Sequence, residues 1–103
     1  MAFAIANYIR AETPEAFDKV IEAFTGRAGL VERMEGFRSL QVLANRDRLE
    51  VVVITVWESR EHFERWVESR EFEEAHKRAR RRRLEGTTSE GVEYEVLDFT
   101  CRG

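Results

Sequence analysis

Residues 49–57 have the sequence Leu-Glu-Val-Val-Val-Ile-Thr-Val-Trp, and this stretch decides the fold of the chain. Every position from Val51 to Val56 is β-branched, and β-branched side chains favour extended strands. A run without polar alternation is typical of a strand whose two faces are both covered. We therefore expect residues 49–57 to form a strand inside a larger assembly of strands.

Three other strands are expected around it. Residues 3–10 alternate with period two, which predicts a half-buried strand. The face that carries Phe3, Ile5 and Ile9 also carries Asn7, a polar exception among apolar side chains. Residues 37–44 and 92–100 are the remaining candidates, with a hairpin loop at 45–48 and a loop at 86–91.

Capping signals place the helices. Thr13 followed by Pro14 predicts an N-cap and a first helical position, with an apolar stripe extending to Phe24. Ser59 is the expected N-cap of a second helix, and Ser69 that of a third helix that enters the arginine run at 78–83. The inward face of the second helix is expected to consist of Phe63, Trp66 and Val67.

The resulting order, β-α-β-β-α-α-β, predicts an α+β protein of the ferredoxin-like split βαβ type, with the two later helices counted as one broken crossover. Helices would cover one face of a four-stranded antiparallel sheet and leave the other face open and apolar. A symmetric homodimer, a dimeric α/β barrel with the sheets packed face to face, is the expected way to bury that face. We expect one domain over residues 1–103.

Composition narrows the function classes. The chain has 103 residues, with 17 basic and 20 acidic side chains and a net charge of −3, which argues against a dedicated nucleic-acid binder. Neither a secretory signal nor a membrane span is predicted. Cys101 is the single cysteine, so an internal disulfide is impossible and a cytoplasmic location is expected. Nucleotide-binding glycine motifs are absent from the sequence.

The most informative residue is His76. Read at helical spacing, it forms one apolar stripe with Phe72, Ala75 and Ala79, so an imidazole is set into an inward face. Two further side chains on inward faces are unusual, the amide of Asn7 on the first strand and the indole of Trp66 on the second helix. Together they are what a pocket for a large flat apolar ligand needs, and a metal at the centre of that ligand would account for the histidine.

A neutral imidazole on an apolar helical face can be a single axial ligand to heme iron. Arg80 and Arg83 follow His76 at i+4 and i+7, where their guanidinium groups could meet porphyrin carboxylates. The alternative is that His76 is a structural residue with an internal partner. The arginine run equally fits a contact for an acidic reductase or a solvated helix end.

Four segments resemble one known family, the IsdG-type heme-degrading branch of the antibiotic biosynthesis monooxygenase superfamily. They are Asn7 in the first strand, Met34-Glu35-Gly36-Phe37, Thr55-Val56-Trp57-Glu58-Ser59 with Trp66 beyond it, and Phe72-Glu73-Glu74-Ala75-His76-Lys77. The Gly-Phe and Val-Trp-Glu-Ser signatures are shared by the wider superfamily and indicate the fold. The combination of Asn7, Trp66 and His76 is specific to the heme-degrading branch.

The resemblance implies that His76 is the proximal iron ligand, and that Asn7 and Trp66 lie on the distal side of the heme. Asn7 would hydrogen-bond the oxygen species there, and Trp66 would help to ruffle the ring. Heme would be both substrate and cofactor, with O2 and electrons from an external reductase. Two alternatives are a cofactor-free monooxygenase acting on polycyclic phenols and a non-enzymatic heme-binding protein. The tetrapyrrole product and the one-carbon fragment are not specified by the sequence.

Overall fold

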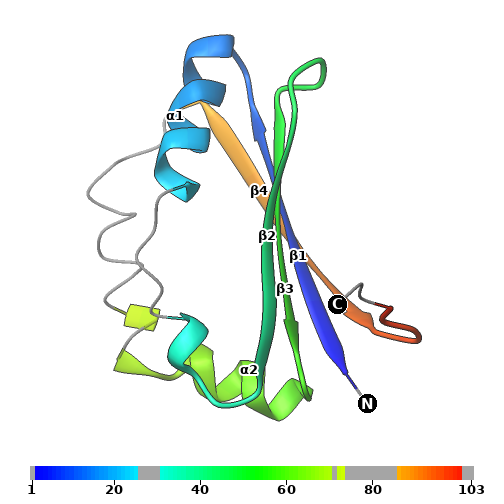
Figure 1. The fold of residues 1–103 in the computed structure, drawn as a ribbon. Helices are drawn as coiled ribbons and strands as arrows, with labels where there is room; N and C mark the ends of the chain where they lie inside the picture. The colour runs from blue at the N-terminus through cyan, green and yellow to red at the C-terminus, as the bar shows by residue number, and fades with distance from the viewer. Residues whose placement is uncertain (1, 26–30, 71, 74–85, 101–103) are drawn as a thin grey trace.

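The computed structural model describes residues 2–25, 31–70, 72–73 and 86–100, and it shows a four-stranded sheet with helices on one side (Figure 1). The sheet order is β2-β3-β1-β4, and every neighbouring pair is antiparallel. The expected ferredoxin-like α+β fold is therefore confirmed. In chain order the elements are β1 (Phe3–Ala11), α1 (Pro14–Phe24), a short 3₁₀ helix (Val31–Arg33), β2 (Phe37–Asn45), β3 (Glu50–Trp57), α2 (Arg60–Val67) and β4 (Thr87–Glu95).

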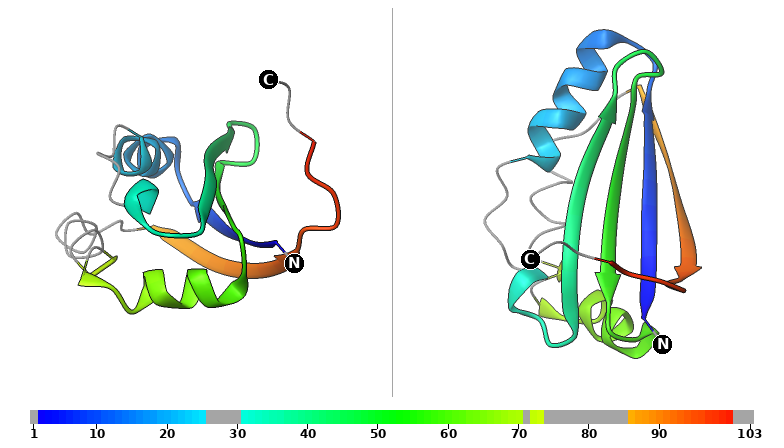
Figure 2. Two further views of the ribbon diagram at one scale, coloured as in Figure 1. Left: turned by 60° about the horizontal axis from the view of Figure 1, so that its bottom comes forward. Right: turned by 45° about the vertical axis from the view of Figure 1, so that its right-hand side comes forward.

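Both helices lie on the same side of the sheet, α1 over one end and α2 over the other (Figures 1 and 2). The segment that follows β4 lies on the opposite side, which carries no helix among the described residues. None of the described helices is long and apolar enough to cross a bilayer.

The predicted caps determine where the helices begin. Thr13 accepts a hydrogen bond from the Ala16 amide at 3.1 Å, and Pro14 opens α1. Ser59 accepts from the His62 amide at 3.3 Å at the start of α2. Ser69 accepts from the Phe72 amide at 3.1 Å, which is the contact expected of the N-cap of a third helix, and the rest of that predicted helix lies largely outside the described residues. Such caps satisfy amide groups that have no carbonyl partner in the first turn.

The last strand differs from the prediction. The sequence placed a loop at 86–91 and a strand at 92–100, whereas β4 extends from Thr87 to Glu95. Its length is set by β1, because Thr87 pairs with Ala11 and Glu95 pairs with Phe3. Beyond Glu95 the partner strand ends, and one further bond, from the Val96 amide to the Ala2 carbonyl at 2.9 Å, closes the ladder. As an edge strand with solvent on one side, β4 tolerates the polar residues that suggested a loop.

Two apolar clusters fill the space between the helices and the sheet. The first lies beneath α1 and contains Ile9, Phe17, Val20, Val51 and Val53. The second lies beneath α2 and contains Phe3, Trp57 and Trp66, with Ile5 and Phe63 among the half-buried side chains around them. Val67, expected on the inward face of α2, is 39% exposed, so of the predicted inward face only Phe63 and Trp66 pack into this cluster.

Candidate functional site

Asn7 lies at the middle of β1, between the two apolar clusters. It pairs with Val53 on one side and with Gly91 on the other, and Val53 pairs in turn with Val42. Because side chains alternate along a strand, Asn7 shares the helix-facing side with Ile5 and Ile9. The row across the sheet is therefore Val42, Val53, Asn7 and Gly91, with one amide among apolar neighbours.

The Asn7 side chain is exposed, although both its same-face neighbours along β1 pack into a cluster. Among the described residues, no hydrogen bond joins the Asn7 carboxamide to another side chain. The structural partner that would make this amide an ordinary core residue is thus not found in the described part of the chain. Its carbonyl oxygen instead lies beside the position of Gly91, where an added Cβ would approach it to 3.0 Å.

Trp66 is buried, as predicted, at 9% exposure. Its ring is stacked on Trp57, with centroids 6.4 Å apart, and meets the edge of Phe72 at 5.4 Å. Aromatic pairs in such arrangements stabilise a core by about 0.5–1.5 kcal/mol beyond area burial. Trp66 is therefore a packing residue as well as a candidate site residue.

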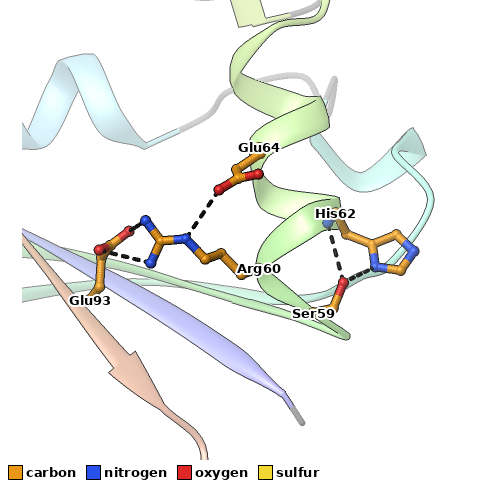
Figure 3. Close-up of polar contacts among 5 residues, drawn as sticks. All are labelled: Ser59, Arg60, His62, Glu64 and Glu93. Carbon is orange, nitrogen blue, oxygen red and sulfur yellow. Dashed lines mark hydrogen bonds and ion pairs between the residues drawn. The ribbon is translucent and has the colours of Figure 1, made fainter.

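Helix α2 is fixed to the edge of the sheet by Arg60 (Figure 3). The guanidinium group of Arg60 forms a fork with Glu93 of β4, at 3.0 and 3.1 Å, and a further bond to Glu64 at 3.1 Å. It also lies over the Phe3 ring, 5.5 Å from the centroid. The hydrogen bonds to Glu93 and Glu64 raise the pKa of Arg60 above its ordinary value.

His62 is half-buried at the start of α2, one helical turn before Trp66. Its Nδ1 lies 2.6 Å from the Ser59 hydroxyl (Figure 3), and its ring packs against Gly36. Gly36 has φ +84, and a Cβ there would overlap the imidazole of His62. His62 therefore takes part in the capped start of α2.

The structure brings two of the sequence-derived candidates to one side of the sheet. Asn7 and Trp66 both belong to the helix-covered face, and Ile5 connects them, since Ile5 packs against the Trp66 cluster and lies beside Gly91. His76, Arg80 and Arg83 lie outside the described residues, as does Cys101. Gly91 was missed by the sequence reasoning, because it was assigned to a loop, where glycine is unremarkable.

Two shallow hollows of about 470 Å³ each lie elsewhere on the molecule. One is on the helix-free side, between β1 and β4, and its lining includes Tyr8 and Tyr94. The other lies at the start of α2 and its lining includes Arg60. Neither hollow is lined by Asn7 or Trp66. Within the described part of the chain, no group of three or more His, Cys, Asp or Glu side chains could hold a metal ion.

Residues 2–78 match the antibiotic biosynthesis monooxygenase family, and the chain belongs to that family. A curated protein of Halalkalibacterium halodurans, named heme-degrading monooxygenase, is 42% identical over 62 residues, which cover 57% of this chain and 53% of that protein. The chain thus spans about half the length of the curated relative that it matches.

Solved structures share the fold. The heme-degrader MhuD from Mycobacterium tuberculosis, solved with two hemes in its active site, is 26% identical with a TM-score of 0.71, covering 96% of this chain and 99% of that one. A mutant of the cofactor-independent oxygenase SnoaB from Streptomyces nogalater is 22% identical with a TM-score of 0.70, covering 95% of each chain. At this identity the likeness to SnoaB concerns the fold alone.

Proposed function

We propose that this protein is a heme-degrading monooxygenase, which binds heme and opens the porphyrin ring oxidatively with O2 and external electrons, releasing iron. The observation that carries the proposal is Asn7, an exposed amide on the helix-covered face of the sheet, between the two apolar clusters. The named activities of the Halalkalibacterium relative and of MhuD support it.

The described residues fit a heme. A porphyrin needs a flat apolar surface, and near Asn7 the sheet face offers the half-buried side chains of Ile5 and Val42. It also needs space, and at Gly91 the sheet carries no side chain, so that a Cβ would fill what is open beside Asn7. A single amide donor among apolar groups is the usual composition of a small-molecule site.

Each candidate residue then has a task. His76 would hold the iron through one imidazole nitrogen, and Arg80 and Arg83 would bind the propionate carboxylates. Asn7 would donate an amide N–H to the group that reacts with the ring, because a fixed donor orients that group. Trp66 would press against the macrocycle from the aromatic cluster. The bound heme supplies both the iron that activates oxygen and the ring that is cleaved.

Titration with hemin is the first test of this proposal. We expect a Soret band that saturates, followed by its loss when ascorbate is added in air with catalase present to remove free peroxide. Binding without loss of the band would indicate a heme-binding protein rather than an enzyme. No shift of the hemin spectrum would contradict the proposal and favour a cofactor-free monooxygenase of the same family.

We further propose that residues 1–103 form one domain that works in the cytoplasm as a homodimer, with an external reductase as electron donor. The helix-free side of the sheet supports the homodimer, because it carries half-buried Val52, Ile54 and Val92 and exposed Leu43 and Tyr94. The segment after β4 lies on the same side (Figure 2), and it contains Leu97 and Phe99, which are 84% and 52% exposed. A contiguous apolar surface of this kind is typical of an interface.

Sedimentation should therefore show two 12.1-kDa chains per particle at micromolar concentration. Ile54→Glu should produce monomers, because it places unpaired carboxylates from both copies in the interface, at a cost of about 3 kcal/mol or more. The matched control is Val67→Glu, which adds the same charge on α2 and should leave the dimer intact. A wild-type protein that sediments only as the single chain would refute the homodimer.

A further inference from the structure

Gly91 has no backbone reason to be a glycine. It lies in the interior of β4, where glycine weakens a strand through its entropy and its missing side chain. The pairing of β1 with β4 continues through Gly91 without a register shift, from Ala6 with Val92 to Tyr8 with Glu90, so no bulge explains it. Its φ is not in the left-handed region, so no strained turn explains it either.

The space on the helix-facing side of Gly91 offers a different reason. A Cβ built there would lie 3.0 Å from Oδ1 of Asn7 and 3.8 Å from Cδ1 of Ile5. A separation of 3.0 Å is closer than carbon and oxygen normally approach, so one of the two atoms would have to move. The Ile5 contact is an ordinary one, whereas the Asn7 oxygen is the far end of a rotatable side chain. An added methyl group would therefore displace the Asn7 carboxamide and leave the backbone of the sheet in place.

We propose that Gly91 is a positioning residue for Asn7: the missing side chain lets the carboxamide lie flat along the sheet beside β4 and present its N–H groups to a ligand. The effect of this positioning on the rate of heme degradation rests on the proposed function. The coupling of residue 91 to the orientation of Asn7 concerns the ligand-free protein and holds independently of heme.

The substitution Gly91→Ala tests the inference, with Ser89→Ala as the matched control. Ser89 lies two positions away on the same strand and face, paired with Ile9 rather than with Asn7. In the ligand-free protein, the side-chain amide NMR signals of Asn7 should move in Gly91→Ala and stay in place in Ser89→Ala. The melting temperature of Gly91→Ala should equal or exceed that of wild type, since alanine is the better strand residue.

With hemin and a reductant, Gly91→Ala should bind heme but degrade it about tenfold more slowly, because small misplacements of an orienting group have large effects on rate. In an Asn7→Ala background the same substitution should cause no further loss, since the group it displaces is gone. Unmoved Asn7 signals, a marked fall in melting temperature, or an equal loss of rate in the Asn7→Ala background would each overturn the inference. A wild-type protein that does not degrade heme would contradict the proposed function, while the NMR comparison would still decide the role of Gly91.

Discussion

Replacement of His76 by alanine should abolish the normal heme spectrum and reduce turnover by at least about 100-fold, since even partners of metal ligands change metal affinity by 10–100-fold. In the sequence, His76 is the histidine on an inward helical stripe, so we expect it to be the sole protein ligand to the iron. Alanine is the best helix former, and the fold should remain largely intact. The measurement is a hemin titration monitored at the Soret band, followed by reduction in air.

His62→Ala is the matched control for this experiment. The His62 ring hydrogen-bonds to Ser59 and packs against Gly36 at the start of α2. Loss of the imidazole should therefore change the helix cap and leave heme binding unchanged. Added imidazole should restore the spectrum of His76→Ala, because it can enter the vacated place as an exogenous ligand. Normal binding and degradation by His76→Ala would show that the site has been assigned wrongly.

The fold could be predicted from the sequence because its signals are local. The β-branched run at 51–56 and the caps Thr13, Ser59 and Ser69 each act within a few residues, and each has its predicted role in the structure. The Gly36-Phe37 pair, by contrast, is explained by contacts with residues that are distant in sequence. Gly36 adopts φ +84 beneath the His62 ring and accepts a hydrogen bond from the Glu58 amide at 2.8 Å, and Phe37 packs on Trp57.

The edge strand could not be predicted in the same way, because its limits depend on a partner that is distant in sequence. Residues 87–91 contain no apolar alternation, and only pairing with β1 makes them a strand. The contact between Gly91 and Asn7 could not be predicted for the same reason, since the two residues become neighbours only when β4 pairs with β1. The predicted roles of His76, Arg80 and Arg83 concern residues outside the described part of the chain and stay predictions.

Asn7 and Trp66 differ in what their loss should do to the fold. Asn7 is exposed, so Asn7→Ala should change the free energy of unfolding by less than about 0.5 kcal/mol, keep heme binding and lose most of the degradation. Trp66→Ala would instead remove a ring that stacks on Trp57 and meets Phe72 edge to face. It would cost about 3–5 kcal/mol, which obscures any catalytic effect. Trp66→Phe is therefore the informative substitution.

Trp57→Phe is its matched control, since both tryptophans belong to the same cluster and Trp57 is fully buried in it. Both replacements should lower the melting temperature. The decrease should be larger for Trp57→Phe, because this replacement also removes the 3.1 Å hydrogen bond from the Trp57 indole to Thr55. If Trp66 crowds the macrocycle, Trp66→Phe should bind heme with little change and degrade it at a reduced rate, while Trp57→Phe should degrade it at the wild-type rate. Rates are compared as loss of the Soret band at a temperature where both variants are folded. Equal rates in the two variants would mean that Trp66 serves the core alone, and that distortion of the ring must come from other residues.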